Sequence, residues 1–119
     1  MAVPMTAAAG YHILADLWGC PLTYLEEAPR LKQILLDAAK KVGFNVVGES
    51  CYQFKPTGAT AVLLLESSHI CAHSWPEHNF VALDIYSCSG EMKAKQAMEY
   101  LVQVLKPKEV KVREVERFR

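Results

Sequence analysis

The sequence predicts an α+β fold: a two-layer sandwich in which an antiparallel-rich sheet carries two helices on one face. Three observations support this prediction. The 119-residue chain is long enough to bury one hydrophobic core but too short for two. Two stretches repeat apolar residues at the three- and four-residue spacing of a helix. Six other stretches alternate, or form short apolar runs bounded by turn residues, as strands do.

The first expected strand covers residues 11–19, where two sets of side chains alternate along the stretch. A loop with two prolines follows it. A helix then runs to residue 42, because Pro29 suits the first turn of a helix and Gly43 suits its end. The apolar stripe of this helix is Leu31, Ile34, Leu35, Ala38 and Val42.

Four strands are expected between the two helices, at residues 44–54, 60–67, 69–75 and 80–88. The stretch at 60–67 is unbroken in its apolar character, which predicts burial on both faces or a place at the centre of the sheet. Residues 76–79 separate the last two strands, and a connection of this length fits a hairpin.

The second helix is expected at residues 93–105, and Pro107 ends it. Residues 109–118 then alternate valine with charged side chains, which is typical of an edge strand. The expected order is therefore β-α-β-β-β-β-α-β. Since both helices cover the same face of the sheet, the other face requires solvent or a partner.

The composition excludes several classes of protein. Thirteen basic and thirteen acidic residues cancel, so the chain lacks the basic excess of a nucleic-acid-binding domain. No apolar run approaches the roughly 20 residues that cross a bilayer. Residues 1–10 do not resemble a signal peptide and are expected to be a disordered leader before one domain at 11–119. Four cysteines without a C-x-x-C pair predict free thiols and a cytoplasmic location.

Reactive side chains concentrate in residues 63–88, where an apolar run leads into two serines, two histidines and a cysteine. Two serines after a strand commonly mark a turn, and a histidine in a strand is commonly a structural residue. A serine-histidine hydrolase needs a serine on a strained elbow, usually within G-x-S-x-G, and the sequence contains no such elbow.

A metal site is a further alternative, because His69, Cys71 and His73 alternate and an unbroken strand points all three side chains the same way. Histidine and cysteine are zinc ligands. Three ligands crowded on one short strand nevertheless give poor tetrahedral geometry, so the sequence predicts no metal.

Three motifs in this stretch occur at fixed distances from one another. The combination is specific, although no single motif would be. The motifs are Ser68-His69, then His73-Ser74-Trp75-Pro76-Glu77, then Asp84-Ile85-Tyr86-Ser87-Cys88. In this respect the chain resembles the prokaryotic class of pyruvoyl-dependent S-adenosylmethionine decarboxylases. The resemblance extends from Gly10 to about Arg117, which is nearly the whole chain.

The resemblance implies a proenzyme that cuts itself. The hydroxyl of Ser68 would attack the carbonyl of Ser67 and replace the peptide bond by an ester. Elimination and hydrolysis would then leave a pyruvoyl group on the new N-terminus. Residues 1–67 would become the β chain and residues 68–119 the α chain.

The resemblance also implies roles for other residues. His73 would accept the proton in the elimination, and Thr60 would stabilise the oxyanion of the acyl shift. The pyruvoyl carbonyl forms a Schiff base with the substrate amine and accepts the electrons of decarboxylation. Cys88 would then return a proton to the substrate carbon. Adenine and ribose would be held by Phe54, Trp75 and Glu77.

Family members of this length are homodimers whose sites are shared between subunits, so the resemblance implies a homodimer as well as a small-molecule substrate. The product would supply the aminopropyl donor for spermidine synthesis. Related pyruvoyl enzymes on this scaffold act on arginine or ornithine instead, and a processing-dead binding homologue is a third alternative. The presence of the adenine and ribose residues favours S-adenosylmethionine.

The chain departs from the family at the cleavage junction. Family members carry glutamate directly before the pyruvoyl serine, whereas here that position is Ser67 and the glutamate is Glu66. A cut before Ser67 is therefore an alternative, but only Ser68 preserves the family spacings to the later motifs. Because strand alternation places Ser68 and His73 on opposite faces, we expect a bulge or kink within residues 66–70.

Overall fold

The structure is a computed structural model that describes residues 10–66 and 68–117. Its main elements follow the expected order, β-α-β-β-β-β-α-β. The strands are β1 (Gly10–Trp18), β2 (Val46–Gln53), β3 (Ala59–Leu65), β4 (Ser68–Trp75), β5 (Phe80–Ser87) and β6 (Glu109–Arg117). The helices are α1 (Ala28–Val42) and α2 (Glu91–Leu105). Two 3₁₀ helices, η1 (Leu22–Tyr24) and η2 (Pro76–His78), were not predicted.

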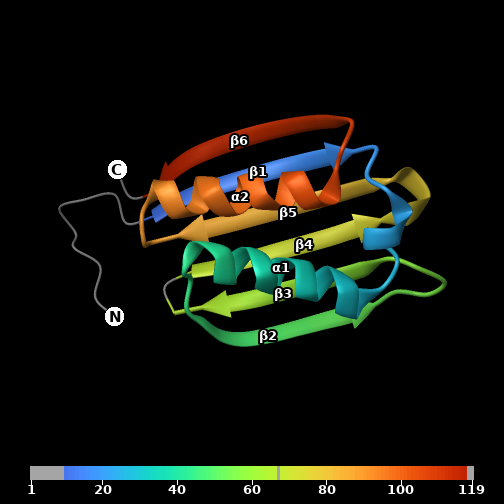
Figure 1. Ribbon diagram of the computed structural model, residues 1–119, viewed down its shortest axis with the longest axis horizontal. Coiled ribbons are helices and arrows are strands. Elements are labelled where there is room, and N and C mark those ends of the chain that lie inside the picture. The colour runs from blue at the N-terminus through green and yellow to red at the C-terminus, as the bar shows by residue number, and fades with distance from the viewer. Residues whose placement is uncertain (1–9, 67, 118–119) are drawn as a thin grey trace.

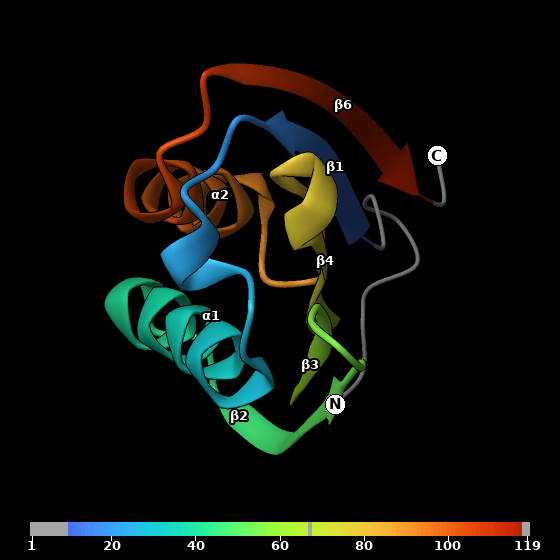
Figure 2. The same ribbon diagram turned by 90° about the vertical axis from the view of Figure 1, so that its right-hand side faces the viewer.

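The strands form one six-stranded sheet in the order β2-β3-β4-β5-β1-β6, and every neighbouring pair is antiparallel. Both helices lie on the same side of the sheet (Figures 1 and 2). The predicted two-layer α+β sandwich is therefore confirmed, and β6 is the edge strand that its valine pattern predicted. We call the sheet face without helices the open face.

The hydrophobic core lies between the helices and the sheet because each element buries one stripe of side chains. On β3 the buried residues are Ala59, Ala61, Leu63 and Leu65. Two alternatives were predicted for this strand. Burial on both faces is wrong, since Val62 is 36% exposed and Leu64 is 56% exposed on the open face. No helix of the described residues covers these two side chains. The strand does lie inside the sheet, between β2 and β4, although not at its centre.

The helix ends follow the local sequence signals. Pro29 lies in the first turn of α1, and Gly43 ends this helix with a φ of 80°, which glycine adopts without strain. The start of α1 also has a partner that the sequence did not predict: Ala28 N–H donates to Gln53 Oε1 at 2.7 Å. Lys106 ends α2 in a left-handed conformation, and Pro107 follows it.

The irregularity predicted within residues 66–70 is wrong for the part that the structure describes. From Ser68 onward β4 keeps an unbroken register, with Ser68 opposite both Leu65 and Ser87. Glu66 lies in a turn, and Ser67 lies outside the described residues. A chain reversal between β3 and β4 thus takes the place of the expected bulge, and a register shift occurs on β2 instead.

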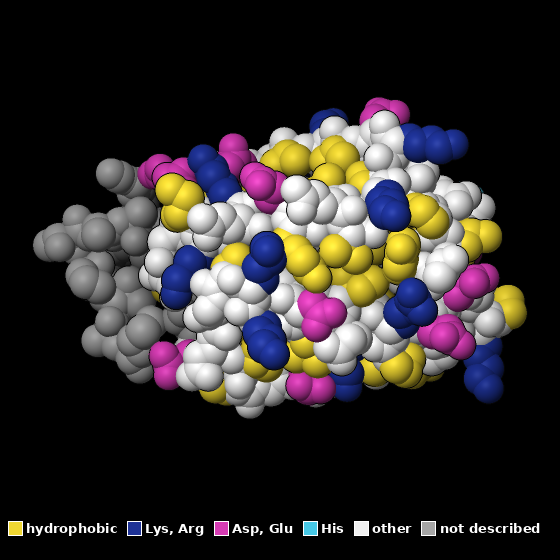
Figure 3. All heavy atoms as spheres, viewed as in Figure 1, with side chains coloured by type: hydrophobic (Ala, Val, Ile, Leu, Met, Phe, Trp, Pro, Cys, Tyr) yellow, Lys and Arg dark blue, Asp and Glu magenta, His cyan; other side chains and the backbone are white. Residues whose placement is uncertain are grey.

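The surface on the helix side mixes basic, acidic and scattered apolar side chains (Figure 3). Within residues 10–66 and 68–117, neither helix has the length and apolar character needed to span a membrane. All four cysteines lie in the described part of the chain and are free. The leader expected at residues 1–10 lies outside the described residues except for Gly10, which begins β1.

Candidate active site

The open face carries most of the residues that the sequence singled out. Along β4, Ile70, Ala72 and Ser74 are buried toward the helices, so the intervening side chains point to the open face. Exposed large apolar side chains gather on this face, a pattern that marks interaction surfaces. They are Leu14, Trp18, Tyr52, Phe54, Val62, Leu64 and Trp75.

One end of the open face contains a cavity of about 400 Å³ where β4 ends and β3 begins. Five residues predicted for the site line it, and we call this region the Trp75 end: Phe54, Thr60, His73, Trp75 and Glu77. Thr60 and His73 are direct neighbours across the β3–β4 ladder, and Thr60 Oγ1 is 3.0 Å from His73 Nδ1. The structure therefore pairs the two residues to which the resemblance assigns the processing reaction.

The aromatic side chains at the Trp75 end are not core residues. Trp75 is 42% exposed and Phe54 is 46% exposed. The Trp75 ring lies 5.6 Å from the Phe80 ring and 6.4 Å from His73, measured between ring centroids. Their exposure excludes plain core packing as the reason for these rings, and it leaves aromatic area at the cavity for a flat ligand.

Buried polar contacts hold the frame of this cavity. Ser74 is 5% exposed, its Oγ donates to the Leu25 carbonyl at 2.7 Å, and it accepts from Ala59 N–H at 3.0 Å. Gly58 has a φ of 105°, and a Cβ there would lie 3.1 Å from the Ser74 carbonyl oxygen. Sequence reasoning missed these contacts. The sequence feature that could have indicated them is a serine at a helix-facing position of a strand, because a buried hydroxyl needs hydrogen-bond partners.

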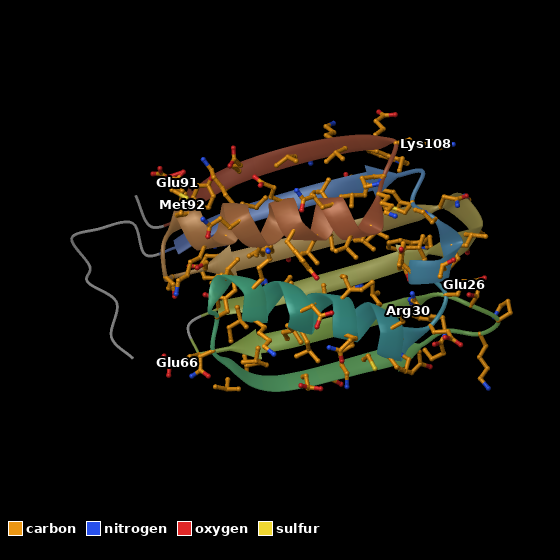
Figure 4. All side chains as sticks on the ribbon, in the orientation of Figure 1. Glu26, Arg30, Glu66, Glu91, Met92 and Lys108 are labelled. Atoms are coloured by element: carbon orange, nitrogen blue, oxygen red, sulfur yellow. The ribbon has the colours of Figure 1, made fainter. Side chains whose placement is uncertain are left out.

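Ser68, the first residue of β4, and Cys88, which follows β5, lie at the opposite end of these two strands. Strand alternation groups Ser68 with the helix-facing residues Ile70, Ala72 and Ser74. Ser68 Oγ accepts a hydrogen bond from Cys88 N–H at 2.9 Å, and both residues are half-buried. We call this region, with Tyr86, the Ser68 end. The labelled Glu66 and Glu91 mark this end of the molecule, and Glu26 and Arg30 mark the other (Figure 4).

Tyr86 is tightly surrounded at the Ser68 end. Its ring centroid is 5.4 Å from that of His12 and 5.9 Å from that of His69, and the Arg117 guanidinium lies 5.6 Å from it. The pKa of Tyr86 is raised, first by burial and then by the Cys88 thiol, to which its hydroxyl is hydrogen-bonded. Tyr86 therefore fixes the surroundings of the thiol at this end.

The two ends do not meet within one protomer. The structure brings Ser68 to Cys88 and Thr60 to His73, but it keeps these pairs apart. His73 follows Ser68 by five positions on a regular strand, which corresponds to about 16 Å at roughly 3.3 Å per residue. A histidine at that distance cannot exchange a proton with Ser68 of its own chain.

The three alternating residues His69, Cys71 and His73 do not assemble into one metal site. Cys71 lies opposite Asp84, and burial, with a further contribution from this carboxylate, raises the pKa of the Cys71 thiol to about 11. His69 instead lies beside His12 and Asp84. Sequence reasoning missed this second group because its members come from three strands.

Comparisons with known proteins point to one family over nearly the whole chain. A model of the family described as S-adenosylmethionine decarboxylase matches residues 11–118. The S-adenosylmethionine decarboxylase proenzyme of Persephonella marina is 42% identical over 113 residues, which cover 95% of this chain and 85% of that protein. The corresponding Picrophilus torridus proenzyme is 37% identical over 113 residues, covering 95% and 87%.

A solved structure is also similar to this chain. The crystal structure of the adenosylmethionine decarboxylase from Aquifex aeolicus superposes with a TM-score of 0.89 at 38% identity. The superposition covers 92% of this chain and 91% of that one.

Proposed function

Because the chain belongs to the S-adenosylmethionine decarboxylase family, we propose that it cuts itself before Ser68 and decarboxylates S-adenosylmethionine with a pyruvoyl group made from that serine. The family that the sequence motifs predicted is therefore confirmed. The role of this family is to supply the aminopropyl donor for polyamine synthesis. The observation that carries the proposal is the single cavity shared by Phe54, Thr60, His73, Trp75 and Glu77.

Self-cleavage begins at Ser68, whose Oγ is held by Cys88 N–H. The oxygen attacks the carbonyl carbon of Ser67, the C–N bond breaks, and an ester forms. His73, paired with Thr60, then takes the proton from the Ser68 Cα, and the Ser67 carboxylate leaves. Hydrolysis releases ammonia and leaves a pyruvoyl group on residue 68. The products are a β chain of residues 1–67 and an α chain of residues 68–119.

The separation of the two ends supports a homodimer. Packing two open faces around a two-fold axis that runs across the strands would bring the Ser68 end of one protomer to the Trp75 end of its partner. The same packing buries the exposed apolar side chains of this face, including Val62 and Leu64. Each dimer then holds two complete sites, and each site takes Ser68 from one chain and His73 from the other.

The residues around Ser68 fit the group that is made from it. The pyruvoyl carbonyl supplies an electrophile that condenses with the substrate amine and accepts the electrons of the broken carbon–carbon bond. Cys88 is placed to donate a proton to the substrate carbon, since its own backbone N–H already contacts Ser68 Oγ. Phe54 and Trp75 offer exposed rings for adenine, and the Glu77 carboxylate accepts hydrogen bonds from the ribose hydroxyls.

These residues also support S-adenosylmethionine over arginine or ornithine. Neither amino acid has an aromatic base or a ribose, so neither uses the exposed rings and carboxylate of the Trp75 end. The paired Thr60 and His73 support a chain that processes itself over an inactive binding homologue. Free thiols are typical of the cytoplasm, which is where we place the enzyme.

Mass spectrometry of the purified full chain tests this function. We expect two fragments that correspond to residues 1–67 and 68–119, with the second blocked by a pyruvoyl group. Ser68→Ala should remain a single chain, whereas Ser67→Ala should still be cut at the same bond. An intact wild-type chain after long incubation contradicts self-processing, and a cut that moves or disappears in Ser67→Ala contradicts the assignment to Ser68.

Release of labelled carbon dioxide then identifies the substrate. The processed protein should release it from carboxyl-labelled S-adenosylmethionine and not from labelled arginine or ornithine. Release from either amino acid in preference to the nucleoside contradicts the assigned substrate while leaving the pyruvoyl mechanism in place.

A further inference from the structure

A second group of reactive side chains lies on the open face beside the Ser68 end. His12 belongs to β1, His69 to β4 and Asp84 to the intervening β5. In the sheet, His12 on β1 and His69 on β4 each lie directly opposite Tyr86 on β5. Asp84 lies two positions before Tyr86 and therefore on the same face. One nitrogen from each imidazole and one carboxylate oxygen all lie within 4.8 Å of one another.

Both imidazoles direct the same nitrogen toward one carboxylate. His12 Nε2 contacts Asp84 Oδ1, and His69 Nε2 is 3.5 Å from Asp84 Oδ2. The side chains are 18% exposed for His12, 34% for Asp84 and 36% for His69. The group is therefore partly desolvated within one protomer.

We propose that His12, His69 and Asp84 form a binding site for a divalent transition-metal ion, with Zn²⁺ as the preferred occupant. Two imidazole nitrogens with one carboxylate favour zinc and its neighbours in the first transition row over Mg²⁺ or Ca²⁺, which prefer oxygen ligands. Three protein ligands leave a fourth tetrahedral position open to solvent or to a partner subunit. None of the three residues has a role in the proposed decarboxylation.

The alternative is a hydrogen-bonded histidine–aspartate group without metal, and Arg117 distinguishes the two. Arg117 Nη1 lies 3.5 Å from His12 Nδ1, where it favours the tautomer that keeps a proton on Nε2. A metal bound to His12 Nε2 requires the imidazole proton to be on Nδ1. The Nδ1–H of His12 and the Nη1–H of Arg117 are then two donors that face each other. The positive charge of Arg117 also opposes a bound cation. Removing Arg117 should therefore tighten metal binding, whereas it should weaken a simple hydrogen-bonded group.

Calorimetric titration with Zn²⁺ tests the site, using the untagged full chain in a buffer that does not bind metal. We expect one ion per chain. His12→Gln should weaken Zn²⁺ binding at least tenfold, as expected when a ligand is lost, and Asp84→Asn should also weaken it. Arg117→Gln should tighten binding severalfold, because the glutamine oxygen accepts from the Nδ1 proton. Absorption of the Co²⁺-substituted protein should show tetrahedral or five-coordinate bands that His12→Gln removes.

The matched control is His78→Ala, which removes an exposed imidazole from η2 outside the group and should leave affinity unchanged. Thermal unfolding of each metal-free variant checks that it is folded. The site is refuted if the native chain binds no ion, if His12→Gln and Asp84→Asn bind as the native chain does, or if Arg117→Gln weakens binding. The uncleavable Ser68→Ala chain should bind Zn²⁺ normally, which separates this result from failure of the proposed decarboxylation.

Discussion

The two ends of β4 have different surroundings. The Trp75 end is framed by buried hydrogen bonds to the backbone, such as those of Ser74, and it surrounds a cavity. The Ser68 end begins at a chain reversal, and side chains packed around Tyr86 define it. Since both ends lie on β4, one strand carries the proposed reaction centre and the proposed binding site about 16 Å apart. In the proposed homodimer, each protomer would contribute half of each of two sites.

The strongest test of this division uses two inactive variants in one dimer. Ser68→Ala and His73→Ala should each remain uncut when expressed alone. In a mixed dimer, the intact Ser68 of one chain meets the intact His73 of the other, so the His73→Ala chain should be cut. With random pairing of equal amounts, about a quarter of all chains should be cleaved. Mass spectrometry identifies which chain was cut.

The same mixture identifies the alternative arrangement. If each site were formed within one chain, neither variant could rescue the other and the mixture would stay uncut. Cleavage of the Ser68→Ala chain in the mixture would contradict the assignment of Ser68 as the attacking residue. Separately purified variants that are never mixed provide the matched control.

Replacing Cys88 by alanine should separate cleavage from catalysis at the Ser68 end. The thiol is the proposed proton donor in decarboxylation, whereas the contact to Ser68 Oγ comes from the backbone N–H, which alanine keeps. We expect cleavage to proceed and kcat to fall by about 10²- to 10⁴-fold. Carbon dioxide release and fragment analysis measure the two effects on one sample.

Cys51→Ala is the control for this substitution, because Cys51 is a half-buried thiol on β2, far from the Ser68 end in the sheet order. It should change kcat little. Equal losses in the two variants would show that the effect of Cys88→Ala is structural.

A smaller effect is expected at the Trp75 end from Glu77→Gln. A hydrogen bond to a charged group contributes about 1.5–3 kcal/mol, so kcat/KM should fall by roughly 10- to 100-fold, mainly through KM. Cleavage should be unaffected, since Glu77 is not assigned to it. Glu99→Gln on the helix side is the control. A loss of kcat alone, with KM unchanged, would move Glu77 from binding to chemistry.

The sequence predicted the elements well because each of them shows the period of one buried face. Neighbours across the sheet were harder to predict. His12 contacts Asp84 across 72 positions, because β1 pairs with β5, which no local pattern reveals. Gln53 at the end of β2 reaches the Ala28 N–H at the start of α1 across 25 positions, and no local pattern reveals this contact either. The bulge expected near Ser68 was wrong because it was inferred in order to bring Ser68 and His73 of one chain to the same face, whereas β4 keeps a regular register between them. The site residues came from motif spacing, and their division between two ends required the sheet register.

Ser74→Ala should produce the smallest change and tests how the Trp75 end is held. The variant leaves the Leu25 carbonyl and Ala59 N–H without the hydroxyl that each contacts, which should cost about 1–3 kcal/mol in the free energy of unfolding. Thermal or urea unfolding measures the loss, and Ser50→Ala at an exposed position of β2 is the control. We also expect KM to rise, because the cavity loses part of its frame. Equal stability of the two variants would show that the aromatic packing, and not the buried hydroxyl, holds the Trp75 end together.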